Sequence, residues 1–377
     1  MPATLAQLHA FAQGGASHAS MCRGMNFIRE SWVSRLEAIT ERARQAANPN
    51  EYERSFARIG RVCELESERI RALGEPDDSW METLGDSFDR FEDAAGSLLS
   101  ELHSRSVSAA SPRTSMAETP LRAQSFSETQ ALASLAFGSI LTFGNILEQQ
   151  ARLNTALKHG ESQFDSIVHP AASVSALVHE TVEQISKDCQ RDHGVAPVIS
   201  IEEPTIRAWC TCVPSQLSSA LGVILNNAAA ATLASRKKLA VSAIAGAAGG
   251  QSAVSPHEAL PAIVVSASGA RGVLAIRVTD RAGGMDPETA RRAFEWGWSI
   301  SAPRADVFSE SPFKDDNREA VRSPRALVSG IGAGLPLAQL HARYMGGHVT
   351  LCPEPGFGTD AFLTVANDGR GDNDSLV

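Results

Sequence analysis

The sequence changes character at about residue 170, and this change constrains the fold more than any other feature. From Phe27 to about Gly160, apolar residues recur at steps of three and four, as on the buried stripe of an amphipathic helix. After residue 170, short runs rich in β-branched residues alternate with helical segments. The sequence therefore predicts a helical bundle followed by an α/β layer with helices on one face of its sheet.

The expected elements can be placed along the chain. Bundle helices are expected at 24–47, 51–73, 78–104 and 128–158. Later helices are expected at 173–191, 213–232 and 333–345. Strands are expected at 197–201, 205–213, 262–268, 273–280, 348–351 and 362–365. These strands are mostly antiparallel, which gives a mixed sheet.

Composition identifies the connections between these elements. Residues 103–127 are rich in Ser and Pro, which predicts a connecting loop, and residues 240–257 are expected to be a surface insertion. The first 29 residues lack Asp and Glu, which fits either an organelle transit segment or an ordinary frayed terminus. The expected organisation is a transit or disordered segment 1–24, a bundle 25–165, an α/β domain 166–366 and a disordered tail 367–377.

Charge and cysteine content narrow the function. A formal net charge of −9 gives no electrostatic reason to expect nucleic-acid binding. No apolar run approaches the roughly 18 residues of a membrane span, so none is expected. The six cysteines are scattered, and only Cys210 and Cys212 are close together, on one face of a strand, which favours reduced structural thiols over a zinc site.

Three clusters in the second half have the character of a nucleotide pocket. In VTDRAGG at 278–284, an Asp ends a strand and can accept a hydrogen bond from an adenine amino group, while small residues leave room for the base. In GIGAGLP at 330–336, glycines run into a helix, where free backbone N–H groups favour phosphate. The third, GFGTDA at 356–361, lies between two strands. Each alone is also compatible with an ordinary turn.

In this order, the clusters resemble the ATP-binding boxes of the gyrase, Hsp90, histidine kinase and MutL superfamily. They resemble more closely the mitochondrial protein kinases of α-ketoacid dehydrogenase complexes, namely the pyruvate dehydrogenase and branched-chain α-ketoacid dehydrogenase kinases. VPSQL at 213–217, FEWGWSISAP at 294–303 and GLPLAQLHARYMGG at 334–347 also carry this resemblance. It implies an α+β fold with an N-terminal four-helix bundle and a C-terminal ATP-binding α/β sandwich that has an ATP lid at 297–329. The insertion expected from composition lies within this domain, at 240–260.

The resemblance also implies a site. Asp280 would bind adenine, the glycines of the second cluster would hold the phosphates, and Asn227 would ligate Mg²⁺. One extra residue near the lid hinge leaves either Ser299 or Ser301 as a nucleotide contact. The full set of expected nucleotide contacts is Asn227, Asp280, Gly284, Ser299, Ser301, Gly330, Ile331, Gly332, Ala333, Gly334, Leu335 and Thr359.

The catalytic helix departs from the family. Positions 223, 227 and 230 share one helical face, where the family presents Glu, Asn and Arg; this chain presents Val223, Asn227 and Ala230. A valine cannot act as the general base, and no Asp or Glu occurs between Glu203 and Glu258. Loss of the Arg also removes positive charge that would stabilise a transferring phosphoryl group.

Three hypotheses follow. The first is an ATP- and Mg²⁺-binding member of the family whose protein-serine/threonine kinase activity is impaired and whose nucleotide state controls a large partner. The second is an active kinase with a relocated base, and the third is a structural subunit that binds no nucleotide. The resemblance implies the mitochondrial matrix as location, an α-ketoacid dehydrogenase complex or another large assembly as partner, and allows a homodimer.

Overall fold

The structure is a computed structural model. It describes residues 17–46, 53–76, 79–109, 120–161, 165–202, 209–247, 261–270, 272–299 and 331–367. The chain divides into two compact units. One unit comprises residues 1–168 and 295–340, and the other comprises residues 169–294 and 341–377.

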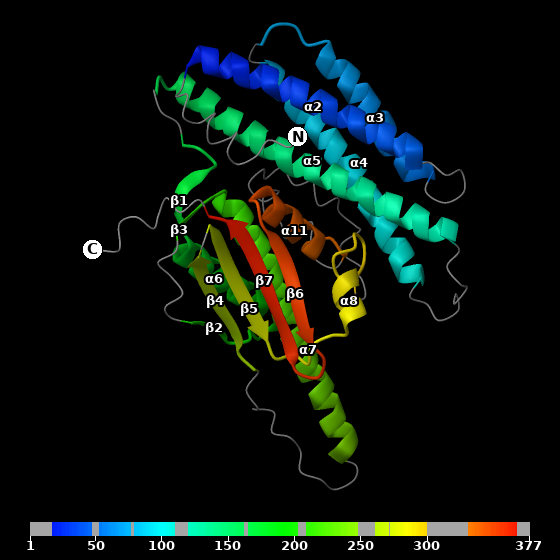
Figure 1. The fold of residues 1–377 in the computed structure, drawn as a ribbon, viewed down its shortest axis with the longest axis vertical. Helices are drawn as coiled ribbons and strands as arrows, with labels where there is room; N and C mark the ends of the chain where they lie inside the picture. The colour runs from blue at the N-terminus through cyan, green and yellow to red at the C-terminus, as the bar shows by residue number, and fades with distance from the viewer. Residues whose placement is uncertain are drawn as a thin grey trace. The chain divides into compact units, whose positions relative to one another are not determined.

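Four long helices form the bundle of the first unit (Figure 1). They are α2 (His18–Ala46), α3 (Glu53–Arg71), α4 (Ser79–Ala109) and α5 (Pro120–Lys158). Helix α2 packs on both α3 and α5. Helix α4 also packs on both α3 and α5, so each helix contacts two others and the bundle is closed. The helical stripe in the sequence is thus the core of this unit.

Trp32 lies at the centre of the bundle core. Its ring stacks on Phe143 of α5 with centroids 3.9 Å apart, and it meets Phe91 of α4 edge-on at 5.2 Å. The indole Nε1 donates a hydrogen bond to the Ser87 hydroxyl at 3.1 Å, so the one polar atom of the ring is satisfied. Three helices are therefore joined through a single buried side chain.

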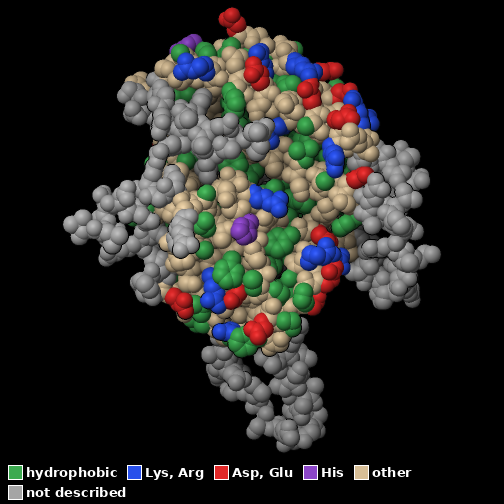
Figure 2. Space-filling model, in the orientation of Figure 1, with side chains coloured by type: hydrophobic (Ala, Val, Ile, Leu, Met, Phe, Trp, Pro, Cys, Tyr) green, Lys and Arg blue, Asp and Glu red, His purple; other side chains and the backbone are tan. Residues whose placement is uncertain are grey.

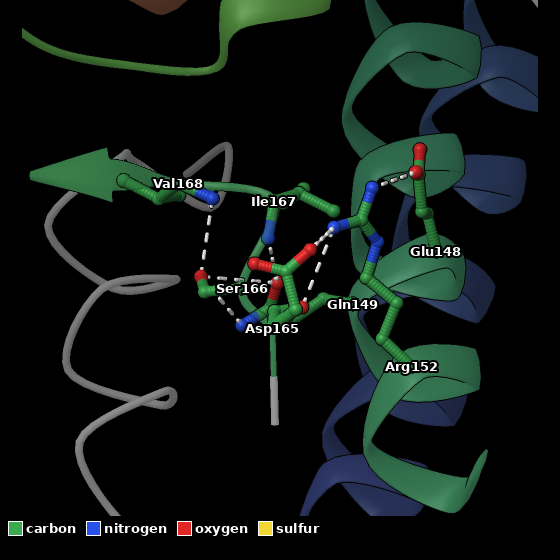
Figure 3. A network of polar contacts seen from close by, with 7 residues as sticks. All are labelled: Glu148, Gln149, Arg152, Asp165, Ser166, Ile167 and Val168. Atoms are coloured by element: carbon green, nitrogen blue, oxygen red, sulfur yellow. Dashed lines mark hydrogen bonds and ion pairs between the residues drawn. The ribbon is translucent and has the colours of Figure 1, made fainter. Parts of the chain in front are cut away.

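The end of α5 holds the chain segment that leaves the bundle (Figure 3). Gln149 accepts a hydrogen bond from the Ile167 backbone N–H at 2.9 Å and donates one to the Ser166 hydroxyl at 3.2 Å. Arg152 pairs with Asp165 at 2.8 Å. The side chains of one helix thereby fix the backbone of residues 165–168.

A five-stranded mixed sheet forms the second unit. Its order is β2 (Ile199–Ile201), β4 (Ile263–Ala270), β5 (Val273–Asp280), β7 (Gly358–Ala366) and β6 (His348–Glu354). Strand β2 runs parallel to β4, and all the other pairs are antiparallel. A separate two-stranded sheet pairs β1 (His169–Ser173) with β3 (Trp209–Cys212). The predicted α+β class is confirmed.

Two helices cover one face of the larger sheet. Helix α6 (Val174–His193) packs on α7 (Pro214–Ala247), and α7 packs on β5 and β7. Side chains of Leu274, Ile276 and Val278 alternate inward along β5 and are buried. This alternation is the period-two pattern that the sequence shows.

Some element boundaries differ from the expectation. Helix α4 continues to Ala109 and α5 begins at Pro120, so both helices extend into the expected connection 103–127. Helix α7 extends to Ala247 and takes in the first part of the expected insertion 240–257. Residues 18–24 of the expected leader are helical in α2. Strand β1 and the short helix α8 (Pro287–Arg292) were not predicted.

Among the described residues, two helical segments are long and apolar enough to cross a membrane by length and composition alone. They are Phe126–Lys158 and Pro214–Arg236, with 50% and 56% of their most apolar windows buried within the fold. This burial is the pattern of core helices. Charged side chains of both signs are interspersed on the face drawn in Figure 2.

Candidate nucleotide site

The predicted adenine-binding carboxylate lies at the last residue of β5. Asp280 is directly opposite Thr359 in the register of β5 with β7, and both residues are only 7% exposed. The Asp280 carboxylate accepts a hydrogen bond from the Ala282 backbone N–H at 2.9 Å. Burial raises the pKa of this carboxyl, and backbone N–H groups of Ala282 and Thr359 oppose that rise. The result is a fixed, desolvated acceptor at the strand end.

Two glycine-containing turns meet beside this carboxylate. The Gly283 N–H donates to the Phe357 carbonyl at 3.2 Å, and the Gly356 N–H donates to the Gly283 carbonyl at 2.7 Å. A Cβ on Gly284 (φ +65°) would lie 2.2 Å from the Glu354 carbonyl oxygen, and one on Gly358 would lie 2.1 Å from the Asp280 carbonyl oxygen. Only glycine fits at these two positions, so VTDRAGG and GFGTDA form one structural unit.

The outward-facing residues of the same two strands form a second link. The Thr279 hydroxyl donates to Asp360 at 2.6 Å, and Arg277 pairs with the other Asp360 oxygen at 2.7 Å. Because side chains alternate across a sheet, these contacts lie on the face opposite Asp280 and Thr359. Asp360 is not among the site residues predicted from the sequence, although its place next to Thr359 and the period of two are visible there.

Helix α7 presents the predicted catalytic positions in two different environments. Asn227 and Ala230 are exposed, whereas Val223 is buried, with 6% of its surface exposed. Val223 stands beside the buried Ile224 and Leu225 and belongs to the apolar part of the helix. The three positions therefore do not form one uniformly exposed face, because the helix turns Val223 toward the core.

The glycine segment belongs to the first unit. Gly332 adopts φ +73°, Ala333 is buried, and Gly334 begins α11 (Gly334–Tyr344). Backbone N–H groups at the first turn of a helix have no intrahelical partner and favour anions. Ile331 is buried, and Leu335 and Ser299 are partly exposed.

The structure thus groups the expected residues in two sets. Asn227, Asp280, Gly284 and Thr359 lie in one compact unit, and Ser299 and the segment 331–335 lie in the other. Gly330, Ser301 and residues 300–329 of the expected lid lie outside the described residues. No group of three or more His, Cys, Asp or Glu side chains suited to a metal ion occurs among the described residues.

Comparison with known proteins finds similarity to mitochondrial kinases. The chain is 27% identical over 201 residues to the mitochondrial pyruvate dehydrogenase (acetyl-transferring) kinase of Ascaris suum, covering 52% of this chain and 42% of that protein. It is 24% identical over 223 residues to isozyme 4 of Mus musculus, covering 58% and 46%. It is 25% identical over 203 residues to the Arabidopsis thaliana kinase, covering 54% and 48%.

The chain is thus similar, at low identity and over about half of its length, to the pyruvate dehydrogenase kinases. The matched region spans less than half the length of these curated relatives. No protein-family model matches the chain. The resemblance drawn from the sequence motifs is confirmed at this level.

Proposed function

We propose that this protein binds ATP as a kinase-like protein of mitochondria whose phosphotransfer activity is impaired. The observation that carries the proposal is the buried carboxylate of Asp280, held at the end of β5 by the Ala282 N–H at 2.9 Å. A desolvated acceptor between glycine turns suits the amino group of adenine. A site without a fixed acceptor would distinguish adenine poorly from bases that lack this amino group.

The proposal assigns separate tasks to the two sets of residues. In one unit, Asp280 and Thr359 are assigned to adenine, and in the other unit the backbone N–H groups of the segment 331–335 are assigned to phosphate oxygens. Asn227 is exposed on α7 and offers an amide oxygen to Mg²⁺. A single amide suits Mg²⁺ that arrives with a nucleotide, since this ion keeps waters and phosphate oxygens as its other ligands. When bound, the nucleotide supplies the transferable phosphoryl group.

Impaired catalysis follows from the residues of α7. A kinase needs a group that accepts the proton of the attacking hydroxyl, and Val223 has no such group. Its side chain is also buried, so the position is part of the core. Absence of a positioned base lowers the rate by about 10²–10⁴-fold. The nucleotide then acts mainly through the conformation that it stabilises.

The names of the relatives give the proposal its cellular setting. The relatives are named as mitochondrial kinases of pyruvate dehydrogenase. We therefore place this protein in mitochondria, with an α-ketoacid dehydrogenase complex as its partner. The chain covers less than half of each relative, so activity toward that complex is part of the proposal.

The proposal is tested by calorimetric titration of Mg²⁺·ATP into the wild-type chain and the Asp280→Ala variant. Asp286→Ala is the matched control, because Asp286 is a nearby carboxylate that is exposed and caps α8 through the Thr289 N–H at 2.9 Å. We expect saturable binding by wild type and Asp286→Ala and loss of binding by Asp280→Ala. Absence of binding by wild type would refute the proposal, and equal binding by all three would place the nucleotide elsewhere.

A second measurement addresses catalysis. The wild-type chain and Asp280→Ala are incubated with radiolabelled ATP and a purified dehydrogenase complex. We expect the wild-type chain to incorporate no more phosphate into the complex than Asp280→Ala does. Rapid incorporation that depends on Asp280 would show an active kinase with a relocated base.

A further inference from the structure

We infer that Gln130 and Trp296 are positioning residues that hold the glycine segment 331–335 in the conformation that receives phosphate. The inference rests on the proposed function and adds a contribution of the helical bundle to nucleotide affinity. Gln130, Trp296 and the glycine segment all belong to the first compact unit. The contacts between them form a continuous chain of short links.

The first link joins α5 to the backbone of residue 296. Gln130 Nε2 donates to the Trp296 carbonyl at 2.9 Å, and Gln130 Oε1 accepts from the Trp296 N–H at 2.6 Å. The Gln130 amide thus both donates to and accepts from one backbone residue, which is the pattern that a neighbouring β-strand would provide. It fixes the peptide planes on both sides of Trp296.

The Trp296 side chain provides the second link. Its Nε1 donates to the Ser134 hydroxyl at 2.9 Å, one helical turn beyond Gln130. Its ring stacks on Phe137 with centroids 4.5 Å apart, and the residue is 4% exposed. Gln130, Ser134 and Phe137 are spaced by four and three residues, so they lie on one face of α5. This face contacts both the backbone and the ring of Trp296.

The third link fixes Gly297 against the end of α4. His103 Nδ1 lies 3.0 Å from the Gly297 carbonyl oxygen, and since a carbonyl only accepts, this nitrogen carries the proton. Gly297 adopts φ +81°, and a Cβ there would lie 2.7 Å from the His103 backbone nitrogen. Glycine is therefore required for this close approach.

The last link reaches the glycine segment itself. The Gly297 N–H donates to the Gly332 carbonyl at 2.9 Å. A Cβ on Gly332 (φ +73°) would lie 2.4 Å from the Trp298 carbonyl oxygen, so residues 297–298 form the surface on which Gly332 rests. A phosphate site made of backbone N–H groups depends on their orientation, and here the orientation is set through Trp296 by α5.

Helix α5 also offers a matched control. Gln149 makes the same kind of contact as Gln130, with one bond to a backbone N–H and one bond donated by its amide, but it holds residues 166 and 167 (Figure 3). Replacing Gln130 with alanine removes its two hydrogen bonds to Trp296, and replacing Gln149 removes its hydrogen bonds to Ser166 and Ile167. Only the change at residue 130 touches the chain of contacts that ends at Gly332.

The experiment compares Mg²⁺·ATP affinity by calorimetry for wild type, Gln130→Ala, Gln149→Ala and Ser134→Ala. Ser134→Ala removes only the acceptor for Trp296 Nε1 and provides a milder variant should Gln130→Ala not fold. Hydrogen exchange of residues 128–137 with and without Mg²⁺·ATP is measured in the same proteins. This nucleotide-dependent difference is a readout that a purely structural role for Gln130 would not move.

We expect Gln130→Ala to weaken Mg²⁺·ATP binding about tenfold, the factor carried by one or two net hydrogen bonds, and Ser134→Ala to weaken it less. Gln149→Ala should bind as wild type. Nucleotide should slow exchange in residues 128–137 of wild type but not of Gln130→Ala. Equal affinity for all the variants, or equal loss in Gln130→Ala and Gln149→Ala, would overturn the inference alone. Absence of binding by wild type would overturn the proposed function and the inference together.

Discussion

The turn at Asp280 and the surface of α7 are two parts of the same compact unit, and they differ in how strongly packing fixes them. At the turn, a Cβ on Gly284 or Gly358 would come within 2.2 Å of backbone oxygen. On α7, Asn227 and Ala230 are exposed. Almost no substitution fits at the two glycines of the turn, whereas substitutions at the exposed positions 227 and 230 of α7 cost the fold little stability.

This difference explains how base recognition and catalysis could separate in one protein. A residue whose environment allows only one side chain is maintained by stability as well as by function. An exposed residue is maintained by function alone. In this chain the residue types expected to bind adenine are present at the constrained turn, whereas α7 keeps the exposed Asn227 but carries Ala at the exposed position 230 and Val at the buried position 223.

The largest effect is expected for Gly358→Ala. The new Cβ would lie 2.1 Å from the Asp280 carbonyl oxygen, so the two strands must separate where they carry the candidate site. We expect a loss of about 4 kcal/mol in the free energy of unfolding, measured by denaturant titration. Gly356→Ala is the control, because Gly356 has φ +86° and open space around it, and should lose about 1 kcal/mol. Equal losses would mean that the turn is no tighter than an ordinary one.

The next largest effect is expected for Val223→Glu, which introduces the carboxylate that the sequence resemblance implies at this position. Val223 is 6% exposed, so the change places a carboxyl in the core and should cost about 3 kcal/mol in the free energy of unfolding. Ala230→Glu adds the same group at an exposed position of α7 and should change stability by less than about 0.5 kcal/mol. If Val223→Glu were as stable as Ala230→Glu, position 223 would be open to solvent in solution.

His341 of α11 gives a third point of comparison, because it is a buried titratable group outside both regions. Burial lowers the pKa of His341 to about 4. Unfolding returns the pKa to about 6.5, so the unfolded chain binds the proton more tightly and stability falls as pH drops from 6.5 toward 4. Between pH 7 and pH 5 this group should cost about 2 kcal/mol.

The measurement is the free energy of unfolding as a function of pH for wild type and His341→Phe. The phenylalanine cannot titrate, so the variant should lose less stability than wild type over this interval. His348→Gln serves as the control, since His348 is an exposed histidine on β6. An identical pH dependence in wild type and His341→Phe would show that His341 is not buried in its neutral form.

The smallest effect on stability is expected for Asn227→Ala. The side chain is exposed, so the free energy of unfolding should change by less than about 0.5 kcal/mol. Affinity for ATP in the presence of Mg²⁺ should fall, while affinity in its absence should stay unchanged. The two titrations with and without Mg²⁺ are the check, and an equal fall in both would remove Asn227 as a metal ligand.

Much of the fold could be predicted because it rests on periodic patterns. The apolar stripe around Trp32 and the alternation of Leu274, Ile276 and Val278 both appear in the sequence as periods near three to four and two. Strand β1 could not be predicted, because the residues His169–Ser173 are short, irregularly paired with β3 and mostly exposed. Such a strand is set by its neighbour and not by its own sequence.

The candidate site was predictable in its residue types but not in its supports. The motifs pointed to Asp280 and Gly284, and these lie together at the end of β5. Helical spacing alone placed Val223 with Asn227, because spacing gives relative angles and not the side on which the core lies. The contact between Gln130 and Trp296 spans 166 positions and leaves no periodic trace in the sequence.

The hydrogen bond between the Gly297 N–H and the Gly332 carbonyl, at 2.9 Å, joins the two ends of the intervening stretch of chain. A Cβ on Gly332 would lie 2.5 Å from the Gly297 carbonyl carbon, so the two glycines share one close backbone contact. A substitution at either glycine therefore displaces the other, although 35 positions separate them in the sequence.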